Sequence, residues 1–298
     1  MVVSGETVDD SERDILKAFL IAATCLAAFL GGTSLAPASS GFCEAPNPAN
    51  VIRGTAGADT IVGTPKRDFI EAGRGNDVIR GLGGPDVICG GLGSDVILGG
   101  SGADDIEGGP GNDRIQGGVG GDSISDGEGS DRVSAGSGND IAWATDGADV
   151  VSLGVGSDYA EDGVGSEILR GGEGHDVFAI GFAKPTGRDS IRGGRGRDGV
   201  SWVNGGDAII DLTSGSVVGP TGPRARLYSI ESAESSLGDD TLIGNAAANR
   251  LIASGGDDHL EGRAGNDLLD GDLGTDFLDG GDGTDTCANG ETALNCEA

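Results

Sequence analysis

The chain has 298 residues, a formal charge of −30 at pH 7 and a pI near 4.1. This acidity excludes a protein that binds nucleic acid or an anionic membrane surface, because such proteins need an excess of Lys and Arg. Sixty glycines and only 4% aromatic residues would by themselves indicate low-complexity disorder. A strict internal period overrides that expectation.

The chain starts with a segment that resembles an export signal. Residues 18–30 are an apolar run, and an A-x-A pattern follows at residues 36–38. We interpret residues 1–38 as a cleaved signal peptide, since a membrane span needs about twenty apolar residues. An uncleaved anchor is the alternative, because acidic residues outnumber Arg13 and Lys17 before the run. The mature chain is expected to be secreted, extracellular or at the cell surface, with no membrane span.

Residues 39–53 are predicted to form an N-terminal cap, and residues 54–202 a first repeat array. From residue 54 to residue 179 the array consists of nine-residue units without a gap. Each unit has an acidic residue at its sixth position and an apolar residue two places later. Glycine recurs at the first, second and fourth positions, as in GGLGSDVIL at residues 90–98. After Phe178 the register slips by four residues, and two further units follow.

This unit cannot be helical, because each glycine costs about 1 kcal/mol in a helix and no 3.6-residue period is present. The glycines belong to turns that need positive φ, and the three residues around the apolar position form a short strand. Two units then make one coil, and coils stack about 4.8 Å apart. The sequence predicts an all-β fold, a right-handed parallel β-roll (β-solenoid) with two stacked nonapeptide arrays.

Stacking places the sixth-position acids of every second unit in columns, since Asp77, Asp95 and Asp113 are eighteen residues apart. Columns of carboxylates repel one another unless cations lie between them. Calcium is the suitable ion, because it accepts six to eight oxygens in adaptable geometry. The predicted metal ligands are Asp59, Asp68, Asp77, Asp86, Asp95, Asp104, Asp113, Asp122, Asp131, Asp140, Asp149, Asp158, Asp176, Asp189, Asp198, Asp240, Asp258, Asp267, Asp276 and Asp285.

Units between residues 122 and 170 lack the first glycine, so weaker sites are predicted there. The replacing residues are Asp126, Ala135, Ala144, Leu153 and Asp162. Residues 203–236 are not a repeat and are expected to be a β connector with strands at residues 208–212 and 227–231. Residues 237–298 are predicted to be a second calcium-binding array with a C-terminal cap.

Export would allow disulfide bonds. Cys287 and Cys296 are expected to pair across the C-terminal turn. Cys43 and Cys89 are the remaining candidate pair, although a regular stack would hold them about two coils, or ~10 Å, apart.

One basic cluster interrupts the acidic chain. Either it contacts an anionic surface polymer, or it pairs locally with acidic neighbours, which is the interpretation we favour. Its members are Lys184, Arg188, Arg192, Arg195 and Arg197.

The units resemble those of the haemolysin-type (RTX) calcium-binding repeat proteins. The resemblance implies Ca²⁺ ions held between stacked turns by the sixth-position Asp and by main-chain carbonyls, with folding triggered outside the cell. No catalytic motif is found, and His175 and His259 lie in no metalloprotease motif. We therefore expect a non-enzymatic, monomeric structural or binding module, with cell-surface polysaccharide or protein as partner. The alternatives are a calcium buffer without a partner and a hydrolase with a cryptic carboxylate site.

Overall fold

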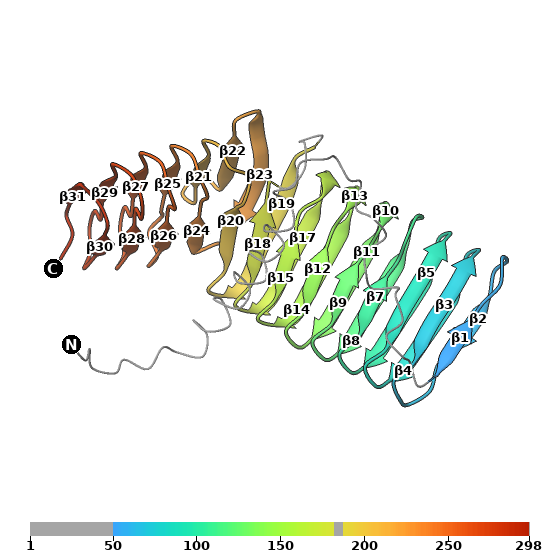
Figure 1. The fold of residues 1–298 in the computed structure, drawn as a ribbon. Coiled ribbons are helices and arrows are strands. Elements are labelled where there is room, and N and C mark those ends of the chain that lie inside the picture. The colour runs from blue at the N-terminus through green and yellow to red at the C-terminus, as the bar shows by residue number, and fades with distance from the viewer. Residues whose placement is uncertain (1–49, 182–186, 298) are drawn as a thin grey trace. The chain divides into compact units, whose positions relative to one another are not determined.

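The structure is a computed structural model that describes residues 50–181 and 187–297. Within these residues all regular elements are strands, which follow one another as coils of a parallel solenoid (Figure 1). The predicted all-β, parallel β-roll is confirmed. The described part contains no helix capable of spanning a membrane. The expected signal peptide, Cys43 and Lys184 lie outside the described residues.

Among the described residues, two long sheets form the walls of the solenoid, and their neighbouring strands are parallel except in the connector. The first sheet contains, in spatial order, β1 (Val51–Arg53), β3 (Phe69–Arg74), β5 (Val87–Leu92), β7 (Asp105–Glu107), β9 (Ser123–Ser125), β12 (Ile141–Trp143), β15 (Tyr159–Glu161), β18 (Val177–Ile180), β20 (Gly199–Trp202), β24 (Ser232–Glu234), β26 (Arg250–Ile252), β28 (Leu268–Asp270) and β30 (Thr286–Ala288).

The second sheet contains, in chain order, β2 (Thr60–Val62), β4 (Val78–Gly83), β6 (Val96–Ser101), β8 (Arg114–Val119), β11 (Arg132–Ser137), β14 (Val150–Gly156), β17 (Ile168–Gly174), β19 (Asp189–Gly196), β21 (Ile209–Asp211), β22 (Ser216–Gly219), β23 (Gly222–Tyr228), β25 (Thr241–Ile243), β27 (His259–Glu261), β29 (Phe277–Asp279) and β31 (Thr292–Leu294). A small third sheet joins β10 (Glu128–Gly129), β13 (Asp146–Gly147) and β16 (Val164–Gly165).

The core is a file of apolar side chains between the two long sheets. In the second sheet Ile79 pairs with Ile97, and Ile97 pairs with Ile115. All three side chains are fully buried. This is the register that the nine-residue period predicts, because partners in neighbouring coils are two units apart.

A second inward-facing position was not expected. The sequence suggests one buried side chain per unit, but the first residue of the next unit also faces the core. Ala72, Ala135 and Leu153 are fully buried there. The first-position glycine is therefore not a positive-φ turn residue. Positive φ occurs instead at the second and fourth glycines, as at Gly91 (φ 101°) and Gly93 (φ 138°). The prediction that glycine supplies positive φ in the turns is therefore confirmed for the second and fourth positions and is wrong for the first.

The connector differs from expectation in its second strand. The first expected strand corresponds to β21, but the strand expected at residues 227–231 lies earlier, as β23, because the chain turns at Ser229 (φ 52°). β22 was not predicted, and it joins β21 and β23 as antiparallel neighbours. These three strands lie between β19 and β25 in the second sheet. The first sheet passes directly from β20 through β24 to β26.

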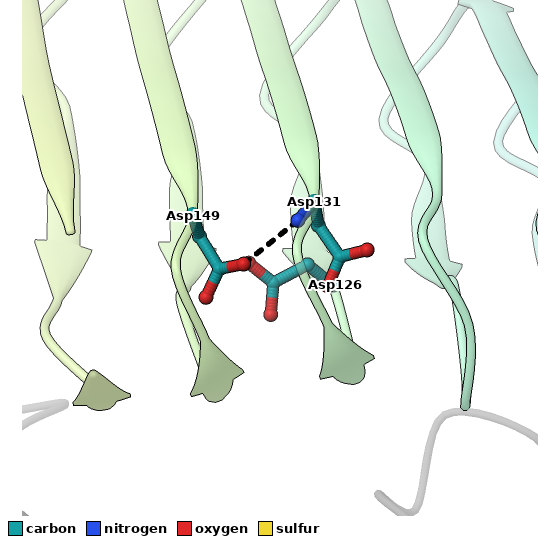
Figure 2. A group of neighbouring side chains, drawn as sticks. All are labelled: Asp126, Asp131 and Asp149. Atoms are coloured by element: carbon teal, nitrogen blue, oxygen red, sulfur yellow. Dashed lines mark hydrogen bonds between the residues drawn. The ribbon is translucent and has the colours of Figure 1, made fainter. Parts of the chain in front are cut away.

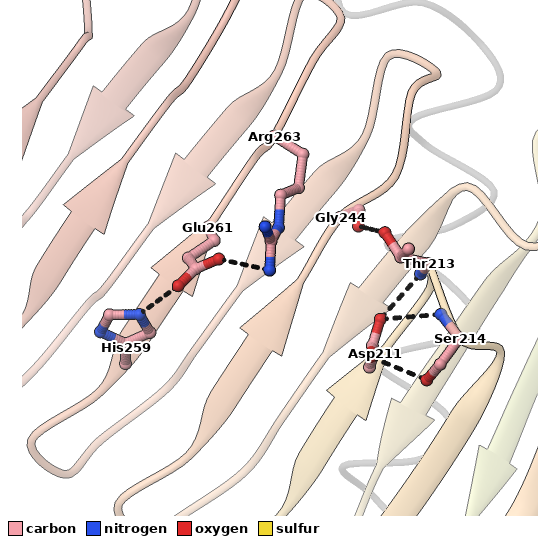
Figure 3. A network of polar contacts seen from close by, with 7 residues as sticks. All are labelled: Asp211, Thr213, Ser214, Gly244, His259, Glu261 and Arg263. Carbon is pink, nitrogen blue, oxygen red and sulfur yellow. Dashed lines mark hydrogen bonds and ion pairs between the residues drawn. The ribbon is translucent and has the colours of Figure 1, made fainter.

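Polar contacts fix the connector to the second array (Figure 3). Asp211 Oδ1 accepts the main-chain N–H groups of Thr213 at 2.8 Å and Ser214 at 3.0 Å. The Thr213 hydroxyl then donates to the carbonyl oxygen of Gly244 at 2.6 Å. The turn after β21 is thereby attached to the neighbouring coil, so the second array continues the stack of the first.

At the C-terminal side, Cys287 and Cys296 form a disulfide bond, as predicted. Cys89 is also disulfide-bonded. Its expected partner, Cys43, lies outside the described residues, so that pairing stays a prediction.

Candidate metal centres

The sixth-position acids stack in two columns, which we call carboxylate ladders. The main-chain N–H of one acid donates to a side-chain oxygen of the acid in the next coil. The amide of Asp77 donates to Oδ1 of Asp95, and the amide of Asp95 donates to Oδ1 of Asp113, both at 2.8 Å. The same contact recurs along both arrays, and it fixes the orientation of each carboxylate.

The second oxygen of most ladder acids has no hydrogen-bond partner among the described residues. These atoms are buried, and a buried polar atom without a partner in a repeated position indicates a ligand. They are Oδ2 of Asp77, Asp86, Asp95, Asp104, Asp113, Asp122, Asp131, Asp140, Asp149, Asp158, Asp176, Asp198, Asp240, Asp258, Asp267, Asp276 and Asp285. All of them belong to the predicted metal ligands.

Two predicted ligands at the N-terminal side have a different environment. Oδ2 of Asp59 accepts the main-chain N–H of Thr55 at 2.6 Å and its hydroxyl at 2.8 Å. Oδ2 of Asp68 accepts the main-chain N–H of Thr64 at 2.5 Å, and its Oδ1 accepts the Thr64 hydroxyl at 3.0 Å and the Asn50 amide at 2.6 Å. Threonine in place of the second glycine thus satisfies oxygens that stay unpartnered in the following coils.

Burial raises the pKa of many ladder acids in the middle of the columns. For Asp86, Asp113 and Asp140 it raises the pKa to about 7, against the opposing effect of the hydrogen bond from the preceding amide. Neighbouring carboxylates in the ladder raise these pKa values further. Without a cation, desolvation and like-charge repulsion therefore oppose ionisation of the ladder.

Carboxylate and main-chain carbonyl oxygens lie close together beside the first-position glycines. A Cβ atom built on Gly90 would lie 2.8 Å from Oδ2 of Asp95, 2.5 Å from the carbonyl oxygen of Gly108 and 3.1 Å from Cδ1 of Ile97. The glycine therefore leaves room for these two oxygens at the edge of the apolar core. These are the donors that Ca²⁺ prefers. The residues therefore fit calcium.

In the stretch without first glycines the ladder persists. Asp131 and Asp140 donate their amides to Asp149 and Asp158, both at 2.8 Å. The irregular member is Glu167, whose two carboxylate oxygens are buried without a hydrogen-bond partner among the described residues. Its longer side chain is the physical reason, since the extra methylene displaces the oxygens from the column.

Sequence reasoning missed two acidic residues at the first position. Asp126 and Asp162 were interpreted as lost glycines, yet they face inward and are buried. Asp126, Asp131 and Asp149 form a group with oxygens within 4.8 Å of one another (Figure 2). Asp162 instead lies 4.0 Å from the guanidinium of Arg224, which also lies over the Trp202 ring at 5.8 Å. An acid where other units have Gly or Ala is the signal that could have revealed both.

The basic cluster contacts its own surroundings. Arg195 forms an ion pair with Glu173 at 2.9 Å, and Arg192 lies over the ring of Tyr228 at 5.3 Å. These contacts agree with local pairing, although Arg195 is largely exposed and its ion pair stabilises the fold little.

The fold and the ladders together define a parallel β-solenoid whose turns carry repeated carboxylate and carbonyl donors. The family profile of the RTX calcium-binding nonapeptide repeat matches residues 53–178, 186–201 and 234–287, roughly two-thirds of the chain. The chain belongs to this family of calcium-binding repeats. A comparison with curated proteins gave no match.

Proposed function

We propose that this protein is a non-enzymatic module that folds when it binds Ca²⁺ and acts outside the cell or at the cell envelope. The ladder acids with an unpartnered oxygen are the proposed ligands, together with main-chain carbonyls of the neighbouring turns. Asp59 and Asp68 at the N-terminal side, and Asp189 beside the connector, complete the ladders and are proposed as further ligands. The partner is proposed to be a cell-surface polysaccharide or protein.

One observation carries the proposal. Two columns of buried carboxylates run through the solenoid, and in most of the acids one oxygen is oriented by an amide while the other has no partner among the described residues. A buried charge without compensation is strongly destabilising. Divalent cations between successive acids remove the repulsion and supply the missing contacts, so ion binding and folding are coupled.

The extracellular location rests on separate features. A disulfide bond such as Cys287–Cys296 forms and persists in oxidising compartments. Calcium outside cells reaches concentrations that fill sites with dissociation constants of about 10⁻⁴–10⁻³ M, as in extracellular modules. The apolar run and the A-x-A pattern support export through a cleaved signal peptide.

The test is a calcium titration of the full chain followed by far-ultraviolet circular dichroism. We expect a largely unfolded spectrum in excess EDTA at low salt and a strand-rich spectrum in millimolar Ca²⁺. Mg²⁺ at the same concentration is the control, because it demands stricter octahedral geometry. A strand-rich spectrum that persists in EDTA would contradict the proposal. A pull-down on cell-wall and polysaccharide fractions, with and without Ca²⁺, then tests the binding role.

A further inference from the structure

Asp126 differs from the ladder acids in its position and in its surroundings. It directly follows β9, at the first place of its unit, and its side chain is fully buried. Its Oδ1 accepts the main-chain N–H groups of Gly127 and Thr145, both at 2.9 Å, so the carboxylate is held in one orientation. Its Oδ2 has no hydrogen-bond partner among the described residues.

Two ladder acids lie next to it. Figure 2 shows the carboxylate of Asp126 extending toward that of Asp149, below Asp131. One oxygen from each of the three residues lies within 4.8 Å of the others. Each residue is buried, and each has an unpartnered Oδ2. Three buried carboxylates therefore lie close enough together to share one ion.

The same repeat position two coils later shows how the chain compensates such an acid. Asp162 occupies the first place of its unit, as Asp126 does. There the protein supplies a cation, the buried guanidinium of Arg224, at 4.0 Å. Between the two lies Ala144, which needs no compensation. Asp126 faces two further carboxylates instead, so it is either protonated or compensated by an ion from solution.

We propose that Asp126, Asp131 and Asp149 together bind one additional Ca²⁺ ion inside the roll, at a site that the nonapeptide pattern does not specify. The proposal rests on the proposed function in one respect, since Asp131 and Asp149 are also ladder ligands. Ca–O distances are about 2.3–2.6 Å, so oxygens on opposite sides of one ion are about 5 Å apart. Oxygens within 4.8 Å of one another can therefore all contact a single Ca²⁺ ion.

The interior site has three carboxylate ligands in a buried place, whereas the ligands of a turn site include neutral main-chain carbonyls as well as carboxylates. Ligand charge is one of the quantities that set calcium affinity. The interior site therefore fills at lower Ca²⁺ concentration than the turn sites, and it stabilises the stretch that lacks first glycines.

The test is isothermal titration calorimetry of the full chain with Ca²⁺ alone, comparing Asp126→Asn with Asp282→Asn. Asp282 is an exposed acid of the second array, so its variant changes the net charge equally at a place far along the chain from the cluster. We expect Asp126→Asn to lose one equivalent of bound Ca²⁺ from the tightest phase, and Asp282→Asn to keep it. Asp126→Ala should behave like Asp126→Asn, and Ala144 shows that alanine fits this position.

An unchanged stoichiometry in both Asp126 variants would overturn the inference, because Asp126 would then be a neutral buried acid. Circular dichroism at saturating Ca²⁺ checks that the variants fold. If Asp126→Asn stays unfolded at saturating Ca²⁺ but Asp126→Ala folds and binds as many Ca²⁺ ions as the wild-type chain, that result also counts against the site. Failure of the proposed function is distinguishable, since the wild-type chain would then bind no Ca²⁺ at all.

Discussion

The main-chain amide of Asp176 donates to Oδ1 of Asp198 at 3.0 Å, although 22 residues separate them. Glu167 and Asp189 in the other ladder have the same 22-residue separation, whereas in the regular coils the contact joins residues eighteen apart, as in Asp158 and Asp176. The four extra residues lie between β18 and β19, and the strands on both sides keep their pairing. The ladder is therefore specified by stacking of the turns and not by constant spacing along the chain.

The ladder acids are not expected to be equivalent. The sequence alone predicts that Asp95→Ala raises the calcium midpoint for folding more than Asp149→Ala, because Asp95 has a complete glycine turn. The structure gives the opposite expectation, since Asp149 belongs both to a ladder and to the group with Asp126. We expect the larger increase for Asp149→Ala, measured by circular dichroism side by side. A larger increase for Asp95→Ala would support the glycine argument and count against the interior site.

Fourth-position glycines that pack against the preceding coil are expected to be irreplaceable. Gly93 has φ 138°, and a Cβ atom there would lie 1.8 Å from the carbonyl oxygen of Gly75. Gly93→Ala should therefore lower the free energy of unfolding in Ca²⁺ by clearly more than about 1 kcal/mol. Gly57→Ala is the control, because nothing lies within 4 Å of a Cβ at that site. Denaturant unfolding of both variants at saturating Ca²⁺ checks this, and equal losses would contradict it.

Arg224 is expected to be essential for the connector. Its removal leaves the carboxylate of Asp162 buried without its cation, which typically costs about 3–5 kcal/mol. Arg224→Met should therefore lower the free energy of unfolding by about 3–5 kcal/mol. The double variant Arg224→Met/Asp162→Ala should recover most of the loss, because the unpaired charge is gone. A double variant as unstable as the single one would show that packing against Trp202, and not charge, is the main contribution of Arg224.

Acidification is expected to oppose calcium binding and to favour the metal-free fold. Burial raises the pKa of Asp86 and Asp113 from 3.8 to about 7. Between these values the folded chain binds more protons than the unfolded chain, so its metal-free stability falls as pH rises. We expect strand content in EDTA to increase between about pH 8 and pH 5, and the calcium midpoint to rise over the same range. Circular dichroism at each pH measures both, and a pH-independent midpoint would contradict this prediction.

Much of the fold could be predicted because the period is local information. The nine-residue unit specifies the size of a coil, the position of each strand and the register between strands. Ile97, for example, is eighteen residues from both Ile79 and Ile115, and it pairs with both. The disulfide between Cys287 and Cys296 also followed from proximity along the chain.

Other features depend on contacts that no local pattern contains. The inward orientation of the first position becomes visible only when the coils are stacked, so Asp126 looked like a lost glycine. The charge of Asp162 is compensated from β23, more than sixty residues later in the sequence. β22 was missed for a different reason, because Pro220 and Pro223 indicate a loop, whereas this segment pairs with its neighbours in the connector.

The ladders have a direction, and this sets an order of events. Each amide donates to an acid that comes later in the chain, and the last donors, Asp276 and Asp285, use the side chains of Glu291 and Glu297. During folding a coil therefore cannot complete its ladder contact until the following coil has formed. A partly folded roll exposes unsatisfied donors on its C-terminal face, and each added coil satisfies the donors of the one before it.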